Sequence, residues 1–249
     1  GRFGEAALPA LTVALDNDDI LVRYNACLAL SGAGTSAISA LGKALEDTEP
    51  IVRQAVLYAL AMIHPRTPAT LEIIRNASQD PSSSVREAAW IAISQYEETL
   101  LRLPLPNAEW KFHLDQERVG TDEQWYEVGF DDSDWADIGI GRAWGEFGYT
   151  GYIGVGWYRR TISVPENPGA TDAVLWFEGV DECAWVWING QYAGEHDIGP
   201  AGWDIPFRID VTDLIRWGED NQITVRAMNT VAAGGIWQPV TLHATRVAP

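Results

Sequence analysis

One phrase occurs three times in the first hundred residues, and it restricts this part of the chain to a series of helical hairpins. The copies are Asn17–Arg23, Asp47–Arg53 and Asp80–Arg86, and each ends in Val-Arg. From valine to valine the spacing is 30 and then 33 residues, which is the length of a helix–turn–helix unit. Each copy begins with an acidic or polar turn of the kind that caps a helix N-terminus. The spacing therefore predicts repeated helix pairs.

Apolar residues on both sides of each phrase follow a helical period. Alanine-rich runs come after the Val-Arg pair, and leucine or isoleucine stripes come before the turn: Leu8, Leu11 and Leu15, then Ile38, Leu41 and Leu45, then Leu71 and Ile74. A single hairpin cannot bury both faces, so neighbouring units must stack into a solenoid. The pattern resembles the HEAT-like repeats over residues 5 to about 98. We expect about three repeats within residues 1–102.

The first four residues suggest a preceding helix. Gly1–Gly4 is typical of the end of a helix, with Gly4 as the residue that stops it, and the chain does not begin with Met. We expect this string to be the tail of an earlier repeat, and the sequence to be a fragment of a longer protein.

The helical pattern ends near residue 105. Pro104 and Pro106 are incompatible with a continuing helix and predict a short stiff linker over residues 103–107. Residues 108–249 then contain short runs with strand character, at Trp110–Leu114, Val155–Val164, Ala173–Phe177, Ala184–Ile188, Phe207–Val211, Gln222–Ala227 and Val240–His243. Asn189-Gly190 predicts a tight hairpin. The fold class is therefore an α-helical solenoid followed by an antiparallel β-sandwich.

Composition and charge exclude several classes of partner. With 35 acidic and 17 basic residues the net charge is −18, which disfavours nucleic acid and anionic membrane surfaces because both would be repelled. No apolar run reaches the roughly 18 residues of a membrane span, so membrane insertion is not expected. Cys27 and Cys183 lie in different parts of the chain and are expected to be buried free thiols.

The strand-rich half carries seven motifs in a specific order. They are Trp110-Lys111-Phe112, Phe130-Asp131-Asp132-Ser133-Asp134-Trp135, Trp157-Tyr158-Arg159-Arg160, Gly179-Val180-Asp181, Val186-Trp187-Ile188-Asn189-Gly190, Phe207-Arg208-Ile209-Asp210-Val211-Thr212 and Gly235-Ile236-Trp237. Together they resemble the sugar-binding jelly roll of family 2 glycoside hydrolases, which include β-galactosidases, β-mannosidases and β-glucuronidases. The resemblance covers residues 108–245. It implies a galactose-binding-like fold, a glycan or oligosaccharide partner and an extracytoplasmic or secreted location.

A sugar site needs aromatic faces next to side chains that bond hydroxyl groups. Three loops offer such residues, and the expected ligand-binding set is Trp144, Glu146, Tyr149, Tyr152, Glu195, His196, Trp203 and Asn229. In the resembling enzymes a carboxylate six residues before the Gly of Gly235-Ile236-Trp237 lines the sugar subsite; Asn229 stands there, and its amide can also bond a hydroxyl. Alternatively, Trp144 and Trp203 cap the ends of the sandwich without contacting a ligand. Exposure of Trp144, Tyr149 and Trp203 around a groove would favour binding.

No catalytic function is predicted for this stretch. Retaining glycosidases need two carboxylates about 5 Å apart, usually on a barrel of alternating strands and helices, and that alternation is lacking. The four histidines are isolated from one another, without zinc-ligand spacing. The acidic turn Phe130–Trp135 is expected to hydrogen-bond backbone amides, with a calcium site as the alternative. No other cofactor is expected.

The sequence thus predicts a non-catalytic carbohydrate-binding module on a helical-repeat scaffold, part of a larger glycan-handling protein. Two alternatives stay open. In one, the jelly roll is a structural or protein-interaction module, and the repeats offer a surface to a protein partner. In the other, the chain is the non-catalytic N-terminal part of a family 2 glycoside hydrolase whose barrel follows residue 249.

Overall fold

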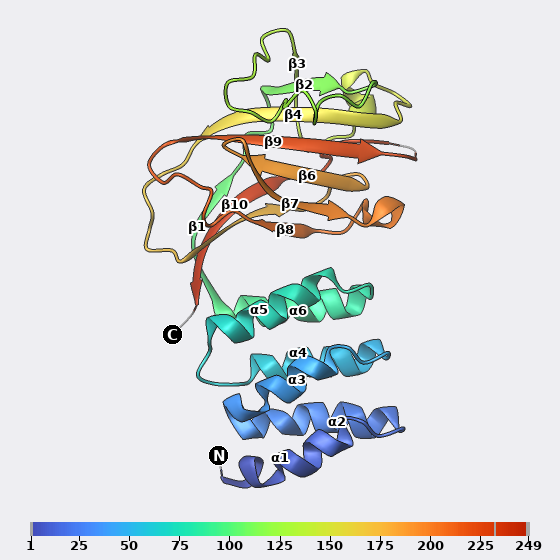
Figure 1. Ribbon diagram of the computed structural model, residues 1–249, viewed down its shortest axis with the longest axis vertical. Helices are drawn as coiled ribbons and strands as arrows, with labels where there is room; N and C mark the ends of the chain where they lie inside the picture. The colour runs from blue at the N-terminus through green and yellow to red at the C-terminus, as the bar shows by residue number, and fades with distance from the viewer. Residues whose placement is uncertain (1, 232, 248–249) are drawn as a thin grey trace. The chain divides into compact units, whose positions relative to one another are not determined.

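The computed structural model describes residues 2–231 and 233–247. The chain divides into two compact units, with the division after Glu98 (Figure 1). The first unit is helical and the second is built from two β-sheets, as the fold class predicted from the sequence requires. Within the described residues, no helix is both long enough and apolar enough to cross a membrane.

The helical unit consists of successive helix pairs. Its elements are α1 (Arg2–Ala14), α2 (Ile20–Leu30), η1 (Ser31–Ala37), α3 (Ile38–Ala44), α4 (Pro50–Ala61), α5 (Pro68–Asn76), η2 (Ala77–Gln79) and α6 (Ser83–Tyr96). The predicted leucine and isoleucine stripes all lie in or against one apolar core. Helix α4 packs between α2 and α6, and its small residues Ala55 and Ala59 are fully buried there. Repeat stacking therefore supplies the burial that a single hairpin lacks.

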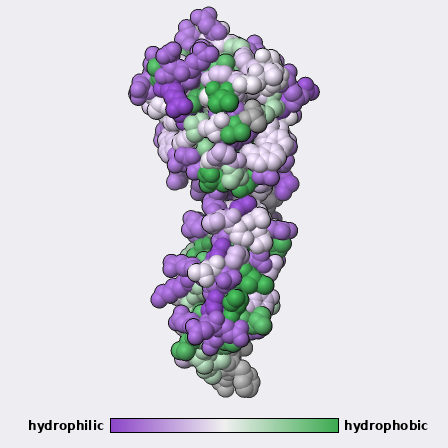
Figure 2. Space-filling view, turned by 90° about the vertical axis from the view of Figure 1, so that its right-hand side faces the viewer, coloured by the Kyte–Doolittle hydropathy of each residue, from purple (hydrophilic) through white to green (hydrophobic). Residues whose placement is uncertain are grey.

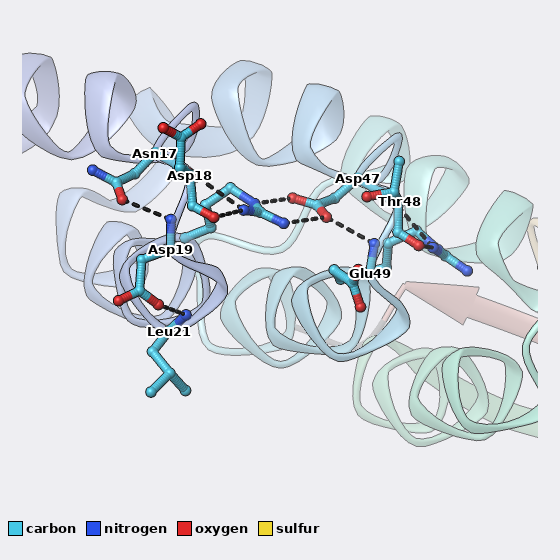
Figure 3. Close-up of polar contacts among 9 residues, drawn as sticks. Asn17, Asp18, Asp19, Leu21, Asp47, Thr48 and Glu49 are labelled. Atoms are coloured by element: carbon cyan, nitrogen blue, oxygen red, sulfur yellow. Dashed lines mark hydrogen bonds and ion pairs between the residues drawn. The ribbon is translucent and has the colours of Figure 1, made fainter.

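The repeated phrase builds a ladder of ion pairs along the turns. The Arg23 Nε donates to Asp47 Oδ2 at 2.7 Å, and the same pairing recurs between Arg53 and Asp80 at 2.8 Å. Arg23 also donates from Nη1 to the carbonyls of Asn17 and Asp18 in its own turn (Figure 3). Each arginine thus joins its own turn to the next one. Of the three predicted N-caps, only Asp19 bonds its helix, through Leu21 N.

The start of the chain differs from the prediction. Gly4 lies within α1, which runs without a break from Arg2 to Ala14, so it does not stop an earlier helix; Gly1 lies outside the described residues. A glycine inside a helix costs only about 1 kcal/mol, which the good helix formers Ala6, Ala7 and Leu8 offset.

The second unit is a sandwich of two sheets. The four-stranded sheet has the order β1-β10-β5-β8, and the six-stranded sheet has the order β3-β2-β4-β9-β6-β7. The strands are β1 (Glu97–Pro104), β2 (Trp110–Leu114), β3 (Ala136–Ile138), β4 (Gly154–Ser163), β5 (Asp172–Phe177), β6 (Cys183–Ile188), β7 (Gln191–Asp197), β8 (Phe207–Asp210), β9 (Asp220–Asn229) and β10 (Val240–Val247). Two short 3-10 segments, η3 (Trp144–Phe147) and η4 (Gly199–Gly202), lie in the loops.

All seven predicted strands are present, and three more were not predicted. The sequence placed residues 103–107 in a linker, whereas Leu103 and Pro104 end strand β1 and Leu105 N donates to the Val240 carbonyl at 2.9 Å. Pro104 is tolerated because β1 is an edge strand, where a missing N–H breaks no ladder on the open side. The predicted hairpin is present: Asn189 and Gly190 both have positive φ, between β6 and β7.

Alternation along β6 supplies two separate cores. Val186 and Ile188 face the other sheet in the main core, whereas Trp187 joins an outer aromatic cluster with Trp125, Trp135 and Trp157. The buried Arg159 guanidinium holds the outer covering segment in place, since it pairs with Asp132 at 2.7 Å and donates to the carbonyls of residues 125 and 127.

Candidate functional site

Three loops meet at one end of the sandwich, which we call the loop end. They are the β5–β6 turn (residues 178–182), the η4 loop (199–205) and the segment after β9 (230–239). The backbone N–H of Asp181 donates to the Gly235 carbonyl at 2.9 Å, which ties the first loop to the third. Trp237 Nε1 donates to the Trp203 carbonyl at 2.8 Å, which ties the third to the second. The end of β9 lies at the right of Figure 1.

Two tryptophans form an exposed platform at the loop end. The rings of Trp203 and Trp237 are stacked, with centroids 5.5 Å apart and planes inclined by 25°. Trp203 is 49% exposed and Trp237 is half-buried. The Trp203 ring therefore has a free surface, and the Trp237 ring supports it from the other side. Such a surface can stack on the C–H face of a sugar ring or on another apolar group.

The buried carboxylate of Glu182 fixes the third loop. Its Oε2 accepts from Thr230 N at 2.9 Å and from Thr230 Oγ1 at 2.6 Å, and its Oε1 accepts from Val231 N at 2.8 Å. Glu182 has a φ of 71°, a left-handed conformation that turns its side chain toward this loop. Three charge-assisted hydrogen bonds compensate the desolvation of the buried carboxylate and anchor the loop.

The neighbouring carboxyl of Asp181 is only half-buried. Burial and, to a smaller extent, the nearby charge of Glu182 together raise the pKa of Asp181 to about 6. A carboxyl with that pKa changes its charge in mildly acidic solution. Below about pH 6 it is mostly protonated and can donate a hydrogen bond, and above that pH it is mostly ionised and only accepts. The loop end therefore combines aromatic faces with a titratable carboxyl.

Two of the expected ligand-binding residues are structural. Trp144 is only 1% exposed, and its Nε1 donates to Tyr158 Oη at 2.5 Å within the core. Asn229 reaches the loop end, but it is equally buried, and its amide is used internally: it donates to the Tyr152 carbonyl at 3.0 Å and accepts from Val231 N at 3.1 Å. Neither side chain presents a free group to a sugar.

The other expected residues are spread over the unit. Tyr149 and Tyr152 pack against the main core, and His196 is buried with its ring stacked on Phe207 at 4.3 Å. Glu146 is exposed on η3; Glu195 is exposed on β7, where it accepts from the Tyr192 hydroxyl at 2.7 Å. Of the expected aromatic residues, only Trp203 combines high exposure with a place at the loop end.

Sequence reasoning missed Trp237, Asp181 and Glu182 as members of this site. Trp237 was visible within the Gly235-Ile236-Trp237 motif, but its stacking on Trp203 joins residues 34 positions apart. Asp181 and Glu182 are adjacent in the sequence, yet one supports a loop and the other faces partly toward solvent. No local pattern distinguishes these two roles.

Large apolar side chains are also exposed on segments that meet here. Ile198 precedes η4, Val231 follows β9, and Ile153 follows Tyr152, whose carbonyl binds Asn229; their exposed fractions lie between 48 and 60%. Figure 2 looks onto this end of the sandwich and shows hydrophobic side chains among pale aromatic ones, with hydrophilic side chains around them. The loop end is therefore an amphipathic surface.

The acidic turn after Phe130 uses its carboxylates within the protein. Asp131 Oδ1 accepts from Ser133 N at 3.1 Å, as predicted, and Asp132 pairs with Arg159. Across residues 2–231 and 233–247, no cluster of three metal-ligating side chains is found.

Comparison with protein families assigns both units. Residues 1–61 and 38–100 match HEAT repeats, and residues 148–238 match the sugar binding domain of glycosyl hydrolases family 2. The second match contains the first two loops of the loop end and the third loop as far as residue 238. Both resemblances predicted from the sequence are confirmed.

Individual relatives agree with these matches. The chain is 32% identical over 143 residues to beta-galactosidase BoGH2A of Bacteroides ovatus, an alignment that covers 53% of this chain and 16% of that protein. It is 26% identical over 129 residues to a beta-glucuronidase of Paenibacillus borealis, covering 49% of this chain and 20% of that protein. This chain therefore spans a fifth or less of the length of these two relatives.

A solved structure supports the fold. The beta-glucuronidase of Ruminococcus gnavus superposes with a TM-score of 0.51 and 18% identity, over 60% of this chain and 29% of that one. The chain thus consists of HEAT repeats followed by a sugar binding domain of the glycosyl hydrolase family 2 type.

Proposed function

We propose that the sandwich is a non-catalytic carbohydrate-binding module, carried on the helical repeats as part of a larger glycan-handling protein. The observation that carries the proposal is the stacked pair of Trp203 and Trp237, with the Trp203 ring exposed, at the loop end to which the half-buried Asp181 also belongs. Aromatic faces and a nearby carboxyl are the two groups that a sugar ring needs.

Hydrogen bonds within the loop end hold its surface in one conformation, which favours ligand binding. Glu182 anchors Thr230 and Val231, and Trp237 is held by the Trp203 carbonyl. A preorganised surface loses little conformational entropy when a ligand binds, so a small contact area can still give measurable affinity. The relatives, named beta-galactosidase and beta-glucuronidase, support a glycan as the ligand.

A second candidate is that this chain is the non-catalytic N-terminal part of a family 2 glycoside hydrolase. It is favoured by the identity of 32% to a beta-galactosidase. In that case the exposed Ile153, Ile198 and Val231 of the loop end would contact a catalytic domain in addition to the sugar. An extracytoplasmic location fits either candidate, because glycan polymers are found mainly outside the cytoplasm.

A glycan array followed by calorimetry tests the first candidate. We expect saturable binding of a neutral or acidic glycoside, and a loss of about tenfold or more in affinity for Trp203→Ala, since stacking contacts of this kind contribute on the order of 1 kcal/mol or more. Trp144→Ala is unsuitable because that ring lies in the core.

The matched control is Tyr192→Ala. Tyr192 is 52% exposed on β7, outside the loop end, so its removal deletes an exposed aromatic ring without touching the platform. Equal losses for both variants would place the sugar elsewhere. Silence of the folded wild type across the array would reject the binding function and favour a structural or protein-docking role.

A further inference from the structure

A groove on another side of the sandwich has features of a second binding site. It is lined by the segment before β2, by β3 and the loop after it, and by the end of β4, and its volume is about 780 Å³. That volume lies in the range of sites for small molecules and short oligosaccharides. None of its lining residues belongs to the loop end.

The groove is unusually basic for this chain. Lys111, Arg142 and Arg160 line it together with only two acidic residues, Glu109 and Asp137, so its formal charge is 3 − 2 = +1. The whole chain carries −18. An anionic ligand that the rest of the surface repels can therefore be accepted here.

The three basic side chains of the groove differ in whether they already have an acidic partner within the protein. Lys111 pairs with Asp137 at 3.0 Å, and Arg160 Nη1 pairs with Glu109 at 3.1 Å. Arg142 is exposed, and it makes no hydrogen bond or ion pair with any residue that the structure describes. The Nε of Arg160 is buried without a partner among those residues. The groove therefore retains hydrogen-bond donors that no protein group uses. Buried donors in native proteins normally have an acceptor, so these donors point to a ligand.

The walls of the groove are held rigidly. Ile140 N donates to the Asn107 carbonyl at 2.9 Å, and Gly141 N donates to the Ile236 carbonyl at 2.8 Å. At Gly139 a Cβ would lie 2.8 Å from the Asn107 carbonyl oxygen and 2.9 Å from the Phe147 ring, so only glycine allows this close approach. The half-buried Phe147 and the buried Ile138 provide an apolar floor beside the charged rim.

A second hollow extends the groove. It has a volume of about 310 Å³ and shares Glu109, Lys111 and Arg160 with the first, so these three side chains form the border between the two. A chain of linked sugar units could therefore continue past Arg160 toward Phe130 and Asp132.

We propose that this groove binds a carboxylate-bearing sugar unit of an acidic oligosaccharide, with Arg142 as the group that pairs with the carboxylate. The planar guanidinium matches a carboxylate in two parallel hydrogen bonds. Asn107 and the carboxylates of Glu109 and Asp137 are then placed to bond the hydroxyl groups, and Phe147 contacts the C–H face of the ring.

Amide NMR spectra of the folded protein test the proposal, with sodium D-glucuronate as the probe and D-glucose as its neutral match. We expect glucuronate to shift the amide signals of Gly139 and Gly141, and added salt to weaken the binding. Glucose is expected to cause much smaller shifts at the same concentration. Absence of shifts with glucuronate and with its linked oligomers would overturn the proposal; equal shifts with glucose would overturn the anionic class of ligand.

Two variants and one control make the assignment specific. Arg142→Gln is expected to weaken glucuronate binding about tenfold or more. Ala108→Trp adds an exposed ring at the groove and is expected to block it without a change of charge. Arg216→Gln removes another exposed arginine, which lies outside both hollows, and is expected to leave binding unchanged. Unaltered binding by Arg142→Gln would refute the assignment. Trp203→Ala is expected to leave these shifts intact, which separates this site from the loop end.

Discussion

Arg53 of α4 and Asp80 of the following turn form a two-pronged ion pair, with Nε–Oδ2 and Nη2–Oδ1 distances of 2.8 Å each. Both side chains are largely shielded from solvent, at 12 and 11% exposure. The second oxygen of Asp80 also accepts from Ser82 N at 2.8 Å. One carboxylate thus joins two repeats and shapes the turn before α6.

Replacing this carboxylate is expected to destabilise the helical unit. Asp80→Ala leaves the Arg53 guanidinium and the Ser82 N–H without their acceptor, and we expect the free energy of unfolding to fall by about 2 kcal/mol. Urea denaturation followed by circular dichroism measures the change. The control is Asp18→Ala. Asp18 binds Arg23 through its backbone carbonyl and not through its exposed carboxylate, so this variant removes a carboxylate but keeps the hydrogen bond. A similar loss for both variants would show that the ladder adds nothing.

Stability of the helical unit is expected to decline in acid. Burial alone would raise the pKa of Asp80, but hydrogen bonds from Arg53 and from the Ser82 backbone outweigh it, so the pKa lies below its usual 3.8. Asp47 behaves in the same way with Arg23. A depressed folded-state pKa contributes stability that is present above the unfolded value and is lost as pH falls through the folded value.

The double variant Asp47→Asn, Asp80→Asn checks that pH dependence. It cannot titrate at these positions. Its free energy of unfolding is therefore expected to be lower than that of the wild type at neutral pH, and to change less with pH below pH 3.8. Parallel curves for the two proteins would mean that other carboxylates cause the acid effect.

Trp144 is expected to behave as a core residue. Its ring is buried between Phe112, Tyr152 and Gly234, and its indole N–H has the Tyr158 hydroxyl as acceptor. Trp144→Ala leaves a large cavity and is expected to lower the stability of the sandwich by about 3–5 kcal/mol. Scanning calorimetry measures it, with Trp203→Ala as the exposed comparison. A loss for Trp144→Ala no greater than that for Trp203→Ala would contradict the buried position.

Asp181 is expected to oppose folding at neutral pH. Burial and the charge of Glu182 raise its pKa from 3.8 to about 6. A raised folded-state pKa means that the contribution of the group is most favourable below pH 3.8 and is lost as pH rises through about 6. Asp181→Asn is therefore expected to be more stable than the wild type at pH 7 and to lack this decline, as thermal unfolding at several pH values can measure. A destabilised variant at pH 7 would indicate a needed ionised carboxylate.

Regular periodicity made most of the fold predictable. The Val-Arg phrase located α2, α4 and α6, and strand β2 lies at Trp110–Leu114, as expected. The missed strands β1, β3 and β7 are all edge strands, and none of them has the run of buried residues that marks the central strand β9. Burial patterns that identify central strands are weak in such segments, so the pairing partner decides their structure.

The candidate site was less predictable than the fold because it depends on long-range contacts. Trp144 and Trp203 are the same residue type on similar glycine-containing loops, yet one is 1% and the other 49% exposed. Their difference follows from Gly234 and Gly235, which pack against the Trp144 ring from a segment some 90 positions later. Composition of a loop predicts which groups are available; it does not predict which side of the loop faces the core.

The arginine ladder also bears on how such an array can change in length over evolution. A unit that begins at Asp47 carries both the acceptor for the arginine before it and, in Arg53, the donor for the aspartate after it. Duplication or loss of one whole unit therefore leaves every internal charge paired. The number of repeats can therefore change by whole units without loss of an ion pair. A break within a unit would instead leave an unpaired charged side chain at the junction.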